Sequence, residues 1–162
     1  MDSRKTLAVV GGALLLVVVL VVVFVQKRGS ATVGDRTEAF FTVDDGKTWF
    51  ADNADRIPPF DKDGKQAVLA HVYRAADGTK FVNYIERFTP EGKRALEEAN
   101  KPDPNRKGPG DPSAIQAAYI GGREIKRPGD AKWVSSANVR EASKITAVKA
   151  PNGGTDATPL DP

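Results

Sequence analysis

The sequence from Leu7 to Val25 reads LAVVGGALLLVVVLVVVFV, which is 19 residues without a charged or strongly polar side chain. At about 1.5 Å of rise per residue, a helix of this length spans roughly 28 Å, close to the ~30 Å hydrocarbon thickness of a bilayer. Because lipid offers no hydrogen-bonding partner to the backbone, such a segment must be helical. We therefore predict one transmembrane helix over residues 7–25.

An uncleaved signal-anchor is favoured over a signal peptide. Signal peptides have an apolar core of about 7–15 residues and a small-residue cleavage site, whereas the run here is longer and the candidate site at residues 29–31 follows the charged pair Lys27-Arg28. Basic residues flank the run on both sides, so the positive-inside rule does not fix the orientation. We favour a cytoplasmic tail at residues 1–6, because a short basic tail before an apolar run is typical of a signal-anchor.

Small residues give the predicted helix a face that another helix can approach closely. Ala8 and Gly12 are four residues apart, and Gly11 lies beside them. This spacing is typical of helix–helix contacts in membranes, although glycine and alanine also occur in such helices by chance. The predicted partners are therefore the lipid bilayer and a protein of a membrane complex, with these three residues as candidate contacts.

The net charge of +3 lies entirely around the apolar run, since residues 1–28 contain four basic residues and one acidic residue, and the remainder contains 20 of each kind. A charge-balanced domain lacks the basic surface that binding to a phosphate backbone requires, so we expect no nucleic-acid partner. The chain has no cysteine and a single histidine, His71, which excludes disulfides, thiolate metal sites and two-histidine metal motifs. We predict no cofactor.

The rest of the chain predicts a small α+β domain of antiparallel β-hairpins with one or two short helices. We expect a juxtamembrane linker at residues 26–38, the soluble domain at residues 39–150 and a disordered tail at residues 151–162, where large apolar side chains are scarce. Residues 101–112 contain four prolines and two glycines and predict a loop.

Capping residues predict the two helices. Thr89 and Pro90 suit the cap and the first position of a helix that runs to about Asn100, and we expect this helix to cover one face of the central hairpin. Asp111-Pro112 predicts a second short helix that ends at Gly121-Gly122. Asp-Gly and Pro-Gly pairs predict the hairpin turns, because glycine adopts a positive φ at no steric cost. The predicted strands are residues 39–43, 48–51, 67–74, 79–88, 124–126, 132–134 and 145–148.

Six aspartates lie between residues 44 and 63, and calcium takes six to eight oxygen ligands around a turn that glycine permits. Asp61 and Asp63, which precede Gly64, are the candidate metal ligands. The segment lacks the alternating ligands and the terminal glutamate of an EF-hand, and aspartates in Asp-Gly turns usually bond their own backbone. A calcium- or small-ligand-binding module that uses residues 44–63 is therefore the alternative function.

A hydrolase built on His71 is a third interpretation. Glu86, on the neighbouring predicted strand, is the candidate acid that would orient the imidazole, and Ser135 or Ser136 would have to supply the nucleophile. A lone histidine in a strand is more often a packing residue, so we predict no enzyme.

Aromatic residues are most simply core residues. Trp49 and the sequence Pro58-Pro59-Phe60 have an alternative interpretation as an exposed recognition patch, and they are candidate partner contacts.

Four stretches carry a resemblance to a known group of proteins: FTVDDGKTWF at residues 41–50, IPPFDKDGK at 57–65, FVNYIERFTP at 81–90 and RPGDAKWV at 127–134. Together they resemble short, uncharacterised proteins of planctomycete-type bacteria, which look like an N-terminal membrane helix plus a small Asp-Gly-rich domain. The likeness covers roughly residues 7–150. It implies a bacterial source and a cell-envelope setting, and it supplies no activity.

We therefore expect a single-pass protein of the bacterial inner (cytoplasmic) membrane with its soluble domain in the periplasm. The expected function is that of an accessory, structural or protein-interaction subunit that docks on a membrane or envelope complex.

Overall fold

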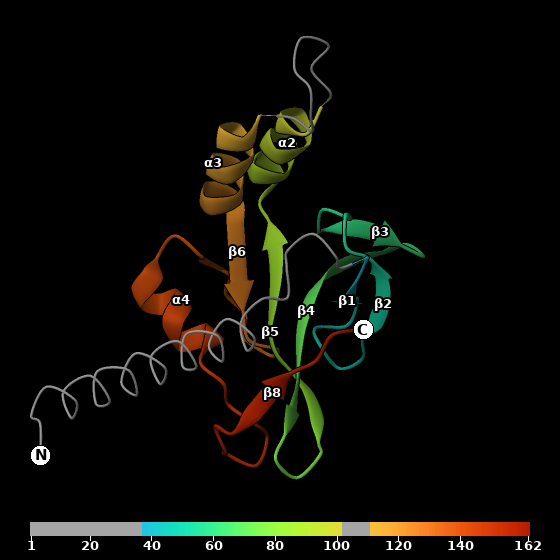
Figure 1. Cartoon of the computed structure of the whole chain (residues 1–162), viewed down its shortest axis with the longest axis vertical. Helices are drawn as coiled ribbons and strands as arrows, with labels where there is room; N and C mark the ends of the chain where they lie inside the picture. Colours follow the sequence, from blue (N-terminus) through green and yellow to red (C-terminus); the bar gives the residue numbers. More distant parts are fainter. Residues whose placement is uncertain (1–36, 102–110) are drawn as a thin grey trace, which may run out of the picture. The chain divides into compact units, whose positions relative to one another are not determined.

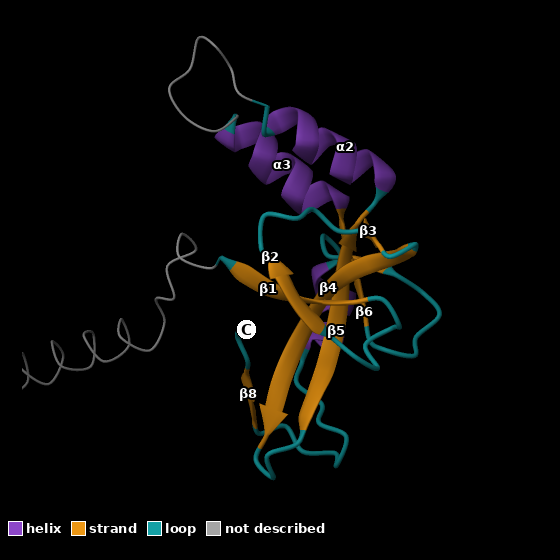
Figure 2. Cartoon of the chain, turned by 90° about the vertical axis from the view of Figure 1, so that its right-hand side faces the viewer, coloured by secondary structure: helices purple, strands orange, loops and turns teal. Residues whose placement is uncertain are grey.

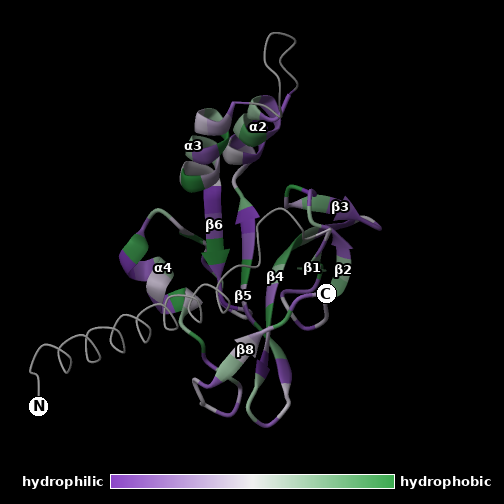
Figure 3. Ribbon diagram, in the orientation of Figure 1, coloured by the Kyte–Doolittle hydropathy of each residue, from purple (hydrophilic) through white to green (hydrophobic). Residues whose placement is uncertain are grey.

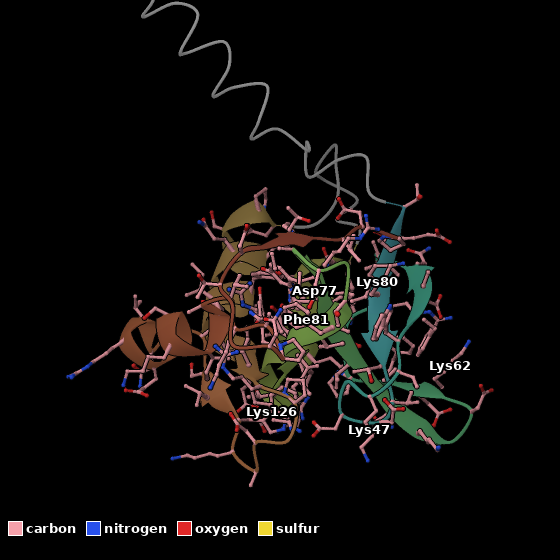
Figure 4. All side chains as sticks on the ribbon, turned by 90° about the horizontal axis from the view of Figure 1, so that it is seen from below. Lys47, Lys62, Asp77, Lys80, Phe81 and Lys126 are labelled. Carbon is pink, nitrogen blue, oxygen red and sulfur yellow. The ribbon has the colours of Figure 1, made fainter. Side chains whose placement is uncertain are left out.

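Two long antiparallel strands, β4 (Lys65–Ala75) and β5 (Lys80–Phe88), form the centre of the sheet. Aromatic and β-branched residues, which favour strands, make up most of β5 and include Val68, Val72 and Tyr73 of β4. Gly78 has a φ of +86° in the turn between them, beside the labelled Asp77 in Figure 4. The computed structural model describes residues 37–101 and 111–162.

The other strands complete a sheet in the order β2-β1-β4-β5-β6-β7, and every pair is antiparallel. Three short strands share the edge of β4 that faces away from β5: β3 pairs with residues 65–67, β1 with residues 68–69 and β8 with residues 73–75 (Figure 1). The pairings β1–β2, β4–β5 and β6–β7 confirm the three predicted hairpins. The remaining strand bounds are β1 Glu38–Thr42, β2 Phe50–Asn53, β3 Phe60–Lys62, β6 Arg123–Lys126, β7 Val134–Ser135 and β8 Ala157–Pro159.

A β-bulge interrupts the central hairpin. His71 pairs with Tyr84 and the next residue, Val72, pairs with Val82, so Asn83 has no partner on β4. Simple alternation would place Val82 and Ile85 on opposite faces, but beyond the bulge both belong to one buried cluster. Asn83 itself is 2% exposed, and the bulge re-aims its side chain out of the ladder.

The main core lies on one face of the central hairpin. Its buried members are Ala70, Val72, Val82 and Ile85, and half-buried aromatic and aliphatic residues pack around them. A second buried cluster lies towards the β4–β5 turn and contains Phe81. The opposite face of the hairpin carries His71, Tyr84 and Glu86.

Helices α2 (Pro90–Ala99) and α3 (Pro112–Gly122) pack on each other at one end of the sheet (Figure 2). Both begin as predicted, because Thr89 Oγ1 accepts the Gly92 amide at 3.0 Å and Asp111 Oδ1 accepts the Ser113 amide at 3.0 Å. However, α2 packs chiefly on α3 and does not cover the central hairpin as we had expected.

The helix that packs on β5, β6 and β7 is α4 (Val139–Thr146) (Figure 1). The sequence predicts an edge strand at residues 145–148, which is wrong: residues 145–146 belong to α4, and residues 147–148 form no strand. Asn138 caps this helix by accepting the Glu141 amide at 3.3 Å. Figure 3 shows hydrophobic and hydrophilic residues mixed along α4, as expected of a helix with one buried side.

The transmembrane part of the predicted fold class has to be corrected. Within the described residues the three helices have ten, eleven and eight residues, and none is long and apolar enough to cross a membrane. At about 1.5 Å per residue they reach roughly 12–17 Å, about half of the ~30 Å hydrocarbon core. The predicted span at residues 7–25 lies outside the described residues. The class that the described residues support is α+β with a mostly antiparallel sheet.

The C-terminal residues differ from the predicted disordered tail at 151–162. Residues 157–159 form β8 on β4, and the Leu160 amide donates to the Val72 carbonyl at 2.9 Å. Leu160 also packs against the main core. The compact unit therefore extends from Thr37 to Pro162.

Candidate functional site

The acidic segment 44–63 holds its own turns together. Asp61 Oδ1 accepts the Gly64 amide at 3.3 Å, which is the turn-forming role of an aspartate. Asp63 is exposed, with a positive φ of 54°. Among the described residues, no group of three or more histidine or acidic side chains is arranged to hold a metal ion.

Asp44 organises the loop between β1 and β2. Its carboxylate accepts the Thr48 amide at 2.9 Å, the Thr48 hydroxyl at 2.7 Å and the Thr42 hydroxyl at 2.9 Å. These bonds, the one from the Thr48 backbone first, lower the pKa of Asp44 to about 2. Asp45 ties the same loop to the β6–β7 turn, because it pairs with Lys126 at 2.7 Å and accepts the Gly129 amide at 2.7 Å. Figure 4 labels Lys126 and, in the loop between β1 and β2, Lys47.

The candidate recognition patch is largely occupied inside the fold. Trp49 packs against the main core, and Pro58 is buried. Phe60 is half-buried, with its ring edge-on to Phe41 at 5.0 Å between centroids. Pro59 is half-buried as well. The other candidate contacts, Ala8, Gly11 and Gly12, lie outside the described residues.

The structure brings His71 together with Glu86, the candidate acid on the neighbouring strand. His71 Nε2 lies 3.3 Å from Glu86 Oε2, and the imidazole stacks on Tyr84 with 3.9 Å between centroids. Glu86 is 4% exposed, so its charge has been taken out of water and needs partners. Burial also raises the pKa of the Tyr84 hydroxyl.

Arg123 on β6 supplies the second partner of Glu86. Its Nη1 lies 3.8 Å from Glu86 Oε1, its Nε donates to Ser136 Oγ at 3.3 Å, and its guanidinium lies 4.8 Å from the centre of the Tyr119 ring. Burial lowers the pKa of Arg123, but the negative charge of Glu86 and the contact with Tyr119 outweigh it, so the pKa is raised overall. The guanidinium is therefore a permanent positive charge above the carboxylate.

The two candidate serines do not complete a nucleophile–base pair with His71. Ser136 Oγ accepts from Arg123, and the exposed Ser135 Oγ accepts the Ala137 amide at 3.3 Å. The imidazole is bonded to Glu86 and to neither serine, so the described contacts assemble an acid–histidine pair next to an arginine rather than a serine triad.

An open cleft of about 370 Å³ lies over this cluster, between the sheet and α4. Four residues of α4 line it, at the spacing of one helix face: Val139, Ala142, Ser143 and Thr146. The floor contains Ile125 and the residues described above, namely His71, Tyr84, Glu86, Tyr119, Arg123 and Ser136. We call this site the α4 cleft.

Exposed apolar side chains border the α4 cleft. Among the described residues, the large hydrophobic side chains that are exposed are Tyr119 at 41%, Ile120 at 55% and Val139 at 75%. Two of the three line the cleft. None of these three residues, nor Arg123, is among the site residues predicted from the sequence.

Comparison with known proteins adds no relative to this picture, since no family model, curated protein or solved structure matches the chain.

Proposed function

We propose that residues 37–162 form a non-catalytic interaction module that receives a segment of a partner protein in the α4 cleft. The observation that carries the proposal is a pair of large, exposed apolar side chains, Tyr119 and Val139, that line an open cleft. Exposed large apolar side chains gathered at one place are typical of protein-binding surfaces.

The charged residues that line the α4 cleft favour specific docking over a purely hydrophobic contact. A buried carboxylate is costly, and a well-packed apolar residue would stabilise the fold as well or better. Glu86 instead holds His71 and Arg123 in fixed positions beneath the cleft, at 3.3 Å and 3.8 Å. Held side chains bind with little loss of conformational entropy.

Binding is favoured over hydrolysis because a hydrolase built on His71 would need a nucleophile within hydrogen-bond reach of the imidazole. Ser136 is engaged with Arg123. The calcium alternative loses support, because Asp44 and Asp61 are engaged in turns, Asp45 is in an ion pair, and the described residues contain no group of three or more side chains that could hold a metal ion. The partner complex and the envelope setting expected from the sequence stay predictions.

Site-specific photo-crosslinking in cells that make the protein tests the proposal. A benzophenone amino acid replaces Val139 in one variant and the exposed Lys65, which lies outside the cleft, in a matched control. We expect a discrete adduct at position 139 that weakens when Tyr119→Ser is added, and no such adduct at position 65. Equal labelling at both positions would remove the case for this cleft as the contact surface.

A further inference from the structure

The α4 cleft offers more hydrogen-bond donors than its own acceptors use. A guanidinium carries five N–H donors in a planar fork. In Arg123 the bond to Ser136 is long at 3.3 Å, one face of the guanidinium contacts Tyr119, and the Glu86 carboxylate lies at 3.8 Å, beyond hydrogen-bond distance. Arg123 lines the cleft and its side chain is 32% exposed, so it keeps capacity for a planar acceptor that enters from the cleft.

Glu86 does not supply that acceptor, because it is buried and its carboxylate lies too far from the guanidinium for a hydrogen bond. Its side chain is 5% exposed, and one of its oxygens is engaged by His71. The carboxylate fixes the two basic side chains from below, while an incoming group meets them from the open side. A second carboxylate suits this position, since arginine forms bidentate, charge-assisted bonds with carboxylates.

The walls of the cleft add a second requirement. Val139 is 75% exposed and Tyr119 is 41% exposed, and both side chains line the cleft. An occupant that only carried charge would leave this apolar surface in water, whereas an apolar neighbour of the charged group would cover it. The two requirements together describe an acidic side chain flanked by aliphatic residues.

We infer that the partner segment received by the α4 cleft is an acidic one, in which a glutamate or aspartate carboxylate binds Arg123 and a flanking aliphatic side chain packs on Val139 and Tyr119. This inference rests on the proposed interaction role. It adds the chemistry of the partner, which the crosslinking experiment does not address.

Titration of the full-length protein with capped tripeptides tests it. The peptides are Leu-Glu-Leu, Leu-Gln-Leu and Leu-Lys-Leu, and the readouts are the dissociation constant and the NMR signal of the Arg123 Nε–H group. Because a hydrogen bond to a charged group contributes more than a neutral one, we expect the glutamate peptide to bind on the order of tenfold more tightly than the glutamine peptide. The lysine peptide should bind most weakly.

Two arginine variants assign the preference. Arg123→Gln should bring the affinities for the glutamate and glutamine peptides together. Arg87→Gln is the matched control, because Arg87 stacks on Trp133 at 4.2 Å and does not line the cleft, and it should keep the preference. The wild-type comparison holds even where Arg123→Gln loses structure.

Several results would overturn the inference: equal affinity for the glutamate and glutamine peptides, the tightest binding by the lysine peptide, no binding of any peptide, or a glutamate preference that survives in Arg123→Gln. Crosslinking at Val139 could still succeed in each of these cases with a partner of other chemistry. Failure of the inference is thus distinguishable from failure of the proposed function.

Discussion

Single residues with buried charge carry the clearest energetic consequences in this fold. Glu86 is 4% exposed and lies between one histidine and one arginine. Its position is stable only while both partners remain, because an unpaired buried charge costs several kcal/mol. Burying the Glu86 carboxylate costs stability, but its contact with Arg123 at 3.8 Å positions the guanidinium at the α4 cleft.

Replacing Glu86 with glutamine tests this balance. The amide keeps the shape but removes the negative charge that faces the half-buried Arg123 guanidinium. We expect Glu86→Gln to lower the free energy of unfolding by about 1–3 kcal/mol, measured by urea denaturation. Glu97→Gln is the control, since the Glu97 side chain is 53% exposed and 3.9 Å from Lys93, and it should change stability by less than about 0.5 kcal/mol. Equal effects of both substitutions would contradict the argument.

Asp44 gives a prediction with a defined pH dependence. Its pKa in the folded protein is about 2, below the ordinary value of 3.8, so the ionised form stabilises the fold above pH 3.8. This contribution declines as the pH falls below 3.8 and is lost through pH 2. After allowance for solvent screening, we expect Asp44→Asn to cost about 1–2 kcal/mol at pH 7 and much less at pH 2.

Urea denaturation of the wild type and Asp44→Asn at both pH values measures the difference. The exposed Asp55 provides the matched substitution, Asp55→Asn. A stability loss for Asp44→Asn that is the same at pH 2 and pH 7 would show that the charge of the carboxylate is not the cause.

At the scale of elements, the crossing of α2 and α3 depends on two glycines. A Cβ atom built on Gly92 would collide with the Cα of Gly122, and the reverse holds as well. The contact also allows the Thr89 amide to donate to the Gly122 carbonyl at 2.8 Å. Since α3 leads directly into β6, this crossing helps to place Arg123 and Tyr119 at the cleft.

Gly92→Ala should therefore be strongly destabilising although alanine is the better helix former. The added methyl group meets backbone, which cannot move aside as a side chain can, so we expect a loss on the order of 2–4 kcal/mol. Gly121→Ala is a sharp control, because a Cβ at that position meets nothing within 4 Å. It should be neutral or stabilising by up to about 1 kcal/mol. Thermal unfolding of both variants measures the contrast, and similar melting temperatures would refute the tight crossing.

Elements were predictable from the sequence where local signals decide them. The caps at Thr89 and Asp111 and the glycine turns fixed two helices and three hairpins. The strand predicted at 145–148 fails because its first two residues belong to a helix. The helical pattern of residues 139–146 becomes visible only when Val139, Ala142 and Thr146 are taken together as one face. The bulge at Asn83 could not be predicted from the alternation of side chains. Val82 and Ile85 are both apolar, so the sequence looks the same whether they lie on one face of the strand or on opposite faces.

The candidate site was predictable only in part for the same reason. His71 and Glu86 lie on two strands of one hairpin, so alternation and register bring them together. Arg123 and Tyr119 are more than 30 residues further along the chain, and their place depends on the β5–β6 pairing and on the α2–α3 crossing. These are tertiary contacts, which no local pattern encodes.

At the scale of the whole folded unit, β4 is closed along one edge by segments from both ends of the described chain. The N-terminal strands β1 and β3 cover its first half, and β8 covers residues 73–75. An uncovered strand edge exposes unpaired backbone groups and invites association. The C-terminal residues therefore protect the central hairpin as well as stabilising it.

Deleting residues 157–162 tests this role. The truncation removes the β8 pairing, the Leu160–Val72 backbone bond at 2.9 Å and the packing of Leu160 on the main core. From one partly buried leucine and several backbone hydrogen bonds we expect a loss of about 2–4 kcal/mol in the free energy of unfolding. We also expect concentration-dependent association, measured by analytical ultracentrifugation, because the edge of β4 is opened.

Leu160→Ala separates the two effects, since it removes the packing but keeps the strand: it should destabilise without promoting association. A truncated protein as stable and as monodisperse as the full chain would mean that β8 contributes nothing to the fold, as expected of a disordered tail.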